Sequence, residues 1–68
     1  MIKQKAYNND RVILGTKALR RYREIVGNKT GIVIDVDYQL AMERYLYTVS
    51  FPGYDVYYLW SYEFNKVK

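Results

Sequence analysis

The stretch RYLYTVSFPGYDVYYLW, residues 44–60, decides the fold expected of this chain. Its first eight residues alternate between two faces, and one of these faces is aromatic or β-branched throughout: Tyr45, Tyr47, Val49 and Phe51. A period of two is typical of a strand with one buried side. In FPGY, Pro52 presets φ and Gly53 supplies the positive φ that a type II turn requires. The run 54–60 then returns as a second strand, so the stretch predicts a β-hairpin.

Two more strands are expected before the hairpin. RVILG at 11–15 is a short β-prone run that ends in glycine, and TGIVIDVDY at 30–38 is a longer one. In the longer run the isoleucines alternate with two aspartates, yet Val33 between them is apolar as well. The sequence therefore leaves open which face of 33–37 is buried, and a β-bulge would resolve the conflict.

The remaining connections complete an all-β pattern. QLAME at 39–43 lacks glycine and proline and is expected to form one helical turn. SYEFNKVK is too short for a helix, so we expect a 3₁₀ turn over 61–64 and a last strand over 65–68. One strand, a long insertion, a three-strand meander, a short turn and a last strand make a small five-stranded SH3-like barrel. Closing the sheet in this way protects its edges.

The insertion between the first two strands reads TKALRRYREIVGN, residues 16–28. Its apolar residues recur with the period of a helix: Ala18, Leu19, Tyr22, Ile25 and Val26. We expect a short helix of about three turns, with Thr16 as N-cap and Gly27 or Asn28 as the stop. A helix this short needs to dock on the sheet to be stable. A long irregular loop with one helical turn is the competing interpretation.

Composition restricts what the chain can do. Its 68 residues form one domain, and it contains no cysteine and no histidine. This excludes disulfides and a Cys/His zinc site, and it suits a reducing cytoplasm. We expect no cofactor, no metal, no small-molecule substrate and no membrane segment, since no apolar run is long enough to span. Residues 1–9 are polar, do not resemble a signal peptide, and are expected to form a flexible segment.

The sequence does not predict an enzyme. Ser50 and Ser61 have no partner suited to activate them. Asp35 and Asp37 lie on the same side of a strand and could hold a cation or act as acid and base, but the solvent face of an amphipathic strand is the favoured interpretation. No glycine-rich phosphate loop is present.

Positive charge is concentrated in the first half of the chain. Residues 1–31 carry a net +6 and residues 32–68 a net −2, which gives +4 overall. The insertion and the lysine just after it supply the candidate site for nucleic acid or an acidic partner: Lys17, Arg20, Arg21, Tyr22, Arg23 and Lys29. Lysine and arginine neutralise phosphates, and the tyrosine could stack on a base. The alternative is a solvated basic face whose tyrosine docks the insertion on the barrel.

A second candidate surface is the aromatic strand of the hairpin. Its large residues are spread over both faces, so some of them must be exposed: Tyr54, Tyr57, Tyr58 and Trp60. Exposed tyrosine and tryptophan are frequent hot spots of protein interfaces. They could also form a cage for a methylated cation, or simply cover a small barrel with their hydroxyls in water.

Three segments of the chain resemble a known family. VGNKTGIVIDV, YLYTVSF and VYYLWSYEFNKV, within residues 26–68, are similar to the small phage- and prophage-encoded SH3-like barrel proteins of the YorP type. The resemblance implies a barrel of phage or mobile-element origin, with 16–25 at the position of a variable long loop. It implies no activity, since fold does not imply function. The acidic loop and Ala-Leu-Tyr-Asp-Tyr motif of polyproline-binding SH3 domains are absent.

These observations predict a non-enzymatic binding module in the cytoplasm of a host cell. Its partner is expected to be nucleic acid, held by the basic insertion. The alternative is a phage-encoded inhibitor or adaptor that binds a host protein through the tyrosine-rich hairpin, in anti-defence or host takeover. A third option is an assembly component that forms a homo-oligomer, and the sequence leaves the oligomeric state open.

Overall fold

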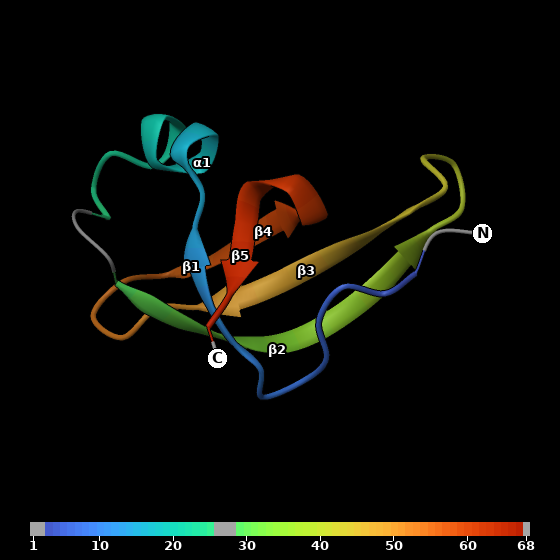
Figure 1. The fold of residues 1–68 in the computed structure, drawn as a ribbon, viewed down its shortest axis with the longest axis horizontal. Coiled ribbons are helices and arrows are strands. Elements are labelled where there is room, and N and C mark those ends of the chain that lie inside the picture. Colours follow the sequence, from blue (N-terminus) through green and yellow to red (C-terminus); the bar gives the residue numbers. More distant parts are fainter. Residues whose placement is uncertain (1–2, 26–28, 68) are drawn as a thin grey trace.

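The computed structural model describes residues 3–25 and 29–67 and shows an all-β fold (Figure 1). The elements follow in the order β1 (Arg11–Leu14), α1 (Thr16–Arg21), β2 (Thr30–Gln39), β3 (Arg44–Ser50), β4 (Val56–Trp60), the 3₁₀ helix η1 (Ser61–Glu63) and β5 (Phe64–Lys66). The strands form one antiparallel sheet in the order β4-β3-β2-β1-β5. This is the predicted five-stranded SH3-like barrel with a helical insertion between its first two strands.

The hairpin of β3 and β4 has the predicted faces. Tyr47 and Val49 on β3 and Leu59 on β4 are fully buried. The turn that joins the strands is closed by a 2.9 Å bond from the Tyr54 amide to the Phe51 carbonyl. Gly53 has φ of 85° there, which confirms the type II turn.

A β-bulge in β2 decides which of its faces is buried. Val33 pairs with Val49, but the next pair is Asp35 with Thr48, so Ile34 is an extra residue without a partner on β3. Before the bulge the odd-numbered Val33 faces the core, and after it the even-numbered Val36 does. The bulge therefore lets both valines point inward while both aspartates stay exposed.

Beyond the bulge, β2 and β3 project from the barrel as an arm (Figure 1). We define this arm as residues 35–46. Its pairing continues to Gln39 with Arg44. The connection at its tip is a tight turn with bonds from the Met42 amide to the Gln39 carbonyl and from the Glu43 amide to the Leu40 carbonyl, both 3.2 Å. These bonds span three residues, close to the single helical turn that was expected.

The helix of the insertion is shorter than predicted. It has six residues instead of about three turns, and its N-cap is Gly15 with no side-chain cap bond, so the prediction of Thr16 as N-cap is wrong. It ends at Arg21, and the irregular chain that follows still buries Ile25 in the core. The competing interpretation, an irregular loop with a helical turn, is closer. The predicted stop at 27 or 28 lies outside the described residues.

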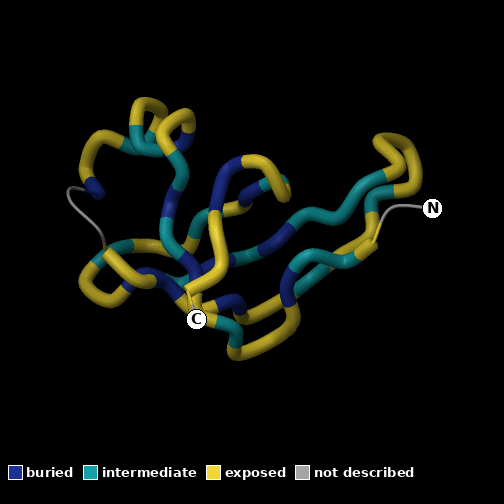
Figure 2. Tube along the Cα trace, viewed as in Figure 1, coloured by how far each residue is buried: buried dark blue, intermediate teal, exposed yellow. Residues whose placement is uncertain are grey.

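The core lies between the curled sheet and the insertion, and Figure 2 shows the buried positions along the middle of the strands. Its members come from every part of the described chain: Ala6, Val12, Leu14, Ala18, Ile25, Val33, Tyr47, Val49, Phe51, Leu59 and Phe64. Of the apolar stripe of the insertion, Ala18 and Ile25 are buried and Leu19 and Tyr22 pack against the core, although the helix ends at Arg21. Val26 lies outside the described residues. Within 3–25 and 29–67, no helix has the length and apolar character needed to cross a membrane.

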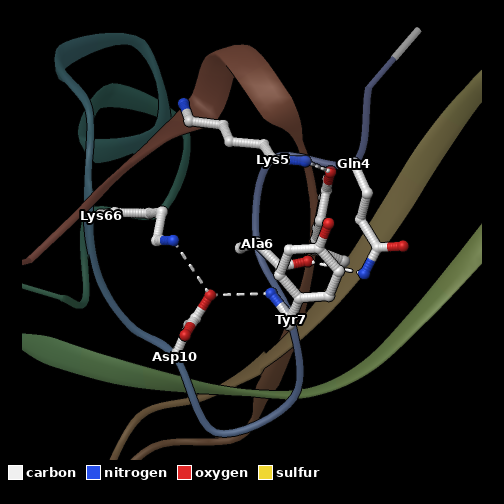
Figure 3. A network of polar contacts seen from close by, with 7 residues as sticks. Gln4, Lys5, Ala6, Tyr7, Asp10 and Lys66 are labelled. Carbon is white, nitrogen blue, oxygen red and sulfur yellow. Dashed lines mark hydrogen bonds and ion pairs between the residues drawn. The ribbon is translucent and has the colours of Figure 1, made fainter.

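The segment before β1 lies against the sheet. Its flexibility was expected for residues 1–9, and of these the structure describes 3–9. Ala6 is fully buried, and the Lys5 amide donates to the Tyr47 hydroxyl over 2.7 Å. The Asn9 amide bonds the Val33 carbonyl at 2.7 Å, and the Val33 amide bonds the Asp10 carbonyl at 2.9 Å. The segment is therefore held by both backbone and side-chain contacts, part of which Figure 3 shows.

Candidate functional site

The exposed cations of the insertion and of the residue that follows it are Lys17, Arg20, Arg21, Arg23 and Lys29, and we call this set the basic face. Lys17 and Arg20 are three residues apart on α1, so they are neighbours on the helix surface. Ala18 is buried between them and turns the opposite side of α1 to the core. The docking of this small residue therefore leaves both long side chains in water.

Arg21 differs from the other cations because it is tied to a buried acid. Its Nη2 atom lies 2.9 Å from Oε2 of Glu63, a residue only 3% exposed. Oε1 of Glu63 accepts a 2.9 Å bond from the Trp60 amide and so caps η1. Arg21 thus links the insertion to the short helix before β5, and its charge is paired with that of Glu63.

Tyr22 also packs inward. Its ring meets the edge of Tyr57 with centroids 4.7 Å apart, and its hydroxyl accepts a 2.5 Å bond from Arg21. The Tyr57 hydroxyl donates to Oε2 of Glu24 at 2.6 Å. This bond lowers the pKa of the Glu24 carboxyl and raises the pKa of Tyr57 to about 12. Tyr22 therefore has the docking contacts that were the alternative to stacking on a base.

An exposed tyrosine that sequence reasoning missed lies beside the basic face. Tyr62 on η1 is 58% exposed, and the Lys17 ammonium lies 5.9 Å from its ring centroid. The 3₁₀ turn was predicted, but nothing in the sequence places it next to α1. The packing of η1 against α1, which joins distant parts of the chain, creates this pair of a cation and an aromatic ring.

The four aromatic residues of the second candidate surface do not gather at one place. Tyr54 and Tyr57 are half-buried and pack against the core. Tyr58 is 57% exposed and lies on the outer face of the sheet, as does the half-buried Trp60. The Arg44 guanidinium lies 5.3 Å from the centroid of the Trp60 ring. The structure therefore separates these residues: Tyr54 in the turn and Tyr57 on β4 pack inward, whereas Tyr58 and Trp60 lie on the outer face of β4.

The carboxylates offer no metal centre in the part of the chain that the structure describes, where no three metal-ligating side chains come together. Asp35 and Asp37 are exposed on the arm, and Asp37 accepts a hydrogen bond from the Gln39 side chain. What the described surface can do chemically is to attract an anion at the basic face and to present an aromatic ring beside it.

Fold and site together define a small SH3-like barrel whose long loop is basic. A scan against protein-family models finds no match, and searches of curated proteins and of solved structures find no significant match. The side chains of the site are therefore the basis on which a function can be proposed.

Proposed function

We propose that this protein is a non-enzymatic module that binds nucleic acid through its basic face. The observation that supports the proposal most is the set of free cations around α1. Among the residues that the structure describes, the ion pairs are Arg21 with Glu63 and Lys66 with Asp10. Lys17, Arg20, Arg23 and Lys29 thus keep their charge for a partner.

The chemistry of this surface suits a phosphate backbone. Lysine and arginine that contact phosphates release counterions, so affinity depends on salt and little on sequence. Tyr62 gives a stacking surface next to Lys17, and base–aromatic stacking is tolerant of sequence too. We therefore propose a single-stranded ligand, with Tyr62 in the stacking role that the sequence assigned to Tyr22.

The test is a fluorescence titration with labelled mixed-sequence single-stranded DNA and RNA at several salt concentrations. Three or four phosphate contacts predict a slope of log affinity against log salt of about −2 to −3. Charge reversal in Lys17→Glu with Arg20→Glu should abolish binding, and Tyr62→Ala should weaken it about tenfold or more.

A matched control separates local from overall charge. Lys3→Glu with Arg11→Glu makes the same change in net charge, from +4 to zero, at exposed positions away from α1. This variant should keep most of its affinity. If both double variants lose binding equally, the site is not the basic face, and if wild-type protein does not bind at low salt the proposal is wrong.

The alternative function is an inhibitor or adaptor of phage or mobile-element origin that binds a host protein in the cytoplasm. It is favoured by the exposure of Tyr58 next to Trp60 on the outer face of β4. A host complex that survives nuclease treatment and is lost in Tyr58→Ser, while Lys17→Glu leaves it intact, would support this function over the first.

A further inference from the structure

The tip of the arm exposes apolar side chains where a hairpin is usually polar. Leu40 is 82% exposed and Met42 is 51% exposed, with exposed Ala41 between them. Glycine, proline, asparagine and aspartate are the common residues of such turns, and none occurs in this one. Exposing three consecutive apolar residues to water is unfavourable in free energy unless a partner covers them.

The arm presents this tip in a fixed position. The rings of Tyr38 and Tyr45, paired across the two strands, meet edge to face with centroids 5.0 Å apart. The next ring, Tyr47, is buried in the barrel, and its centroid lies 6.3 Å from that of Tyr45. The aromatic row continues from the core into the arm, so the tip requires little ordering when it binds.

The charge on the arm narrows the choice of partner. Residues 35–44 carry three acids and one arginine, a net −2. The arginine, Arg44, lies over Trp60 and so points back along β4. Phosphates and anionic lipid headgroups are repelled by such a surface. The partner that fits the arm presents cations next to an aromatic or apolar surface.

The basic face of this same chain has that chemistry. Lys17 and Arg20 are unpaired within the described residues, and the exposed ring of Tyr62 lies beside Lys17. The arm and α1 lie toward opposite ends of the molecule, whose longest dimension is 33 Å (Figure 1). The rigid arm cannot fold back onto its own basic face, so the two surfaces can meet only between copies.

We infer that this protein self-associates head to tail, with the arm tip of one copy on the basic face of the next. Leu40 and Met42 cover Tyr62, and Glu43 faces Lys17 or Arg20. The contact is heterologous, so it leaves a free arm at one end and a free basic face at the other and can extend. A tip of a few residues buries a small area, so the association is weak and sensitive to salt.

Sedimentation velocity measures this association directly. The sedimentation coefficient should rise between about 20 μM and about 1 mM at low salt, the range of weak contacts. It should return to the monomer value at about 0.3 M salt, where the Debye length is short. Leu40→Ser with Met42→Ser should remove the rise, whereas the control Ile34→Ser with Val56→Ser, which changes two exposed apolar residues outside the arm, should keep it.

A mixing experiment tests the head-to-tail arrangement itself. The arm variant Leu40→Ser with Met42→Ser keeps its basic face, and the face variant Lys17→Glu with Arg20→Glu keeps its arm. Each alone should be monomeric, and their mixture should form one-to-one dimers that do not grow. A mixture that stays monomeric, or an arm variant that assembles like wild type, would overturn the inference, as would wild-type protein that stays monomeric at every concentration.

The inference does not rest on nucleic-acid binding, and the variants separate the two. The arm variant should lose self-association and keep its affinity for nucleic acid, because the tip is far from the phosphates. Since both partners use the basic face, a saturating single-stranded oligonucleotide should dissociate wild-type assemblies. Assemblies that persist with oligonucleotide bound would show that the arm docks elsewhere.

Discussion

At the scale of single residues, the buried carboxylate of Glu63 holds the insertion against η1. It is 3% exposed, and both of its carboxylate oxygens have partners, Arg21 and the Trp60 amide. A buried carboxylate without a counter-charge is costly, so the bond to Arg21 does more for the fold than an exposed ion pair does. The four cations of the insertion look alike in the sequence, but Arg21 is a structural link.

This difference predicts unequal effects of two neighbouring substitutions. Arg21→Ala leaves the buried carboxylate with one partner fewer and should lower the free energy of unfolding by about 1–3 kcal/mol. Arg20→Ala removes an exposed side chain of the same helix and should change it by less than about 0.5 kcal/mol. Urea unfolding followed by circular dichroism measures both. Equal losses would contradict the role given to Arg21.

For single residues of the insertion, the sequence predicts exposure but not the long-range contacts. The exposure of Lys17, Arg20 and Arg23 could be predicted, because the apolar stripe of the insertion leaves them no other side. The ion pair of Arg21 could not be, since Glu63 is 42 positions away and no periodicity relates the two. The short distance between Tyr62 and Lys17 likewise depends on the packing of η1 against α1, which are far apart in the sequence.

At the scale of elements, the bulge in β2 has a definite consequence. Ile34 is the extra residue opposite β3, so its deletion should leave Val33 and Val36 facing inward and Asp35 facing outward. We expect the deletion variant to fold, with a loss of about 1 kcal/mol from the altered strand twist.

Deletion of Val36 is the matched control. It removes one residue from the same strand but places an aspartate opposite Tyr47, on the core side of the sheet. An unpaired carboxylate at that position should cost at least about 2 kcal/mol. Denaturant unfolding of both variants, with an NMR spectrum to verify the fold, tests the register. A larger loss for the Ile34 deletion would show that the bulge itself is required.

Element boundaries were predicted well where the pattern has period two and poorly in the insertion. Every strand was placed within a few residues, because alternation and turn chemistry act locally. The helix was predicted too long, because its stripe satisfies a helix and also a loop that folds Ile25 back to the core. Propensity alone does not separate these two, and the tertiary contact decides between them.

At the scale of the whole molecule, the segment before β1 and the last strand, β5, are joined at Asp10. Its carboxylate accepts a 2.8 Å bond from the Tyr7 amide and lies 3.3 Å from the Lys66 ammonium (Figure 3). The bond from Tyr7 is the main cause that lowers the pKa of Asp10 from its ordinary value of 3.8, and Lys66 adds to it. Asp10 therefore fastens the segment before β1 to the last strand.

The lowered pKa predicts how stability depends on pH. A carboxyl whose pKa is lower in the folded state stabilises it above the unfolded value of 3.8, and this contribution is lost as the pH falls through the folded value. Asp10→Asn should therefore be less stable than wild type at neutral pH, and the gap should close below pH 3.8. Asp35→Asn, at an exposed position of the arm, is the control.

Urea midpoints at neutral pH and at about pH 2.5 give the comparison, since the second lies below the ordinary value for an aspartate. A gap between wild type and Asp10→Asn that stays constant across this range would mean that the charge of Asp10 does not stabilise the fold.

The sequence by itself determined the sheet, its turns, the basic insertion and the charge asymmetry, because alternation, proline, glycine and net charge act over a few residues. The tertiary structure alone decided the rest. The bulge determines which face of β2 is buried. Long-range packing places Arg21 beside Glu63 and Tyr62 beside Lys17, and the arrangement of the elements separates the acidic arm from the basic face. Each of these depends on groups far apart in the chain, whose meeting is a property of the folded sheet and of no local pattern.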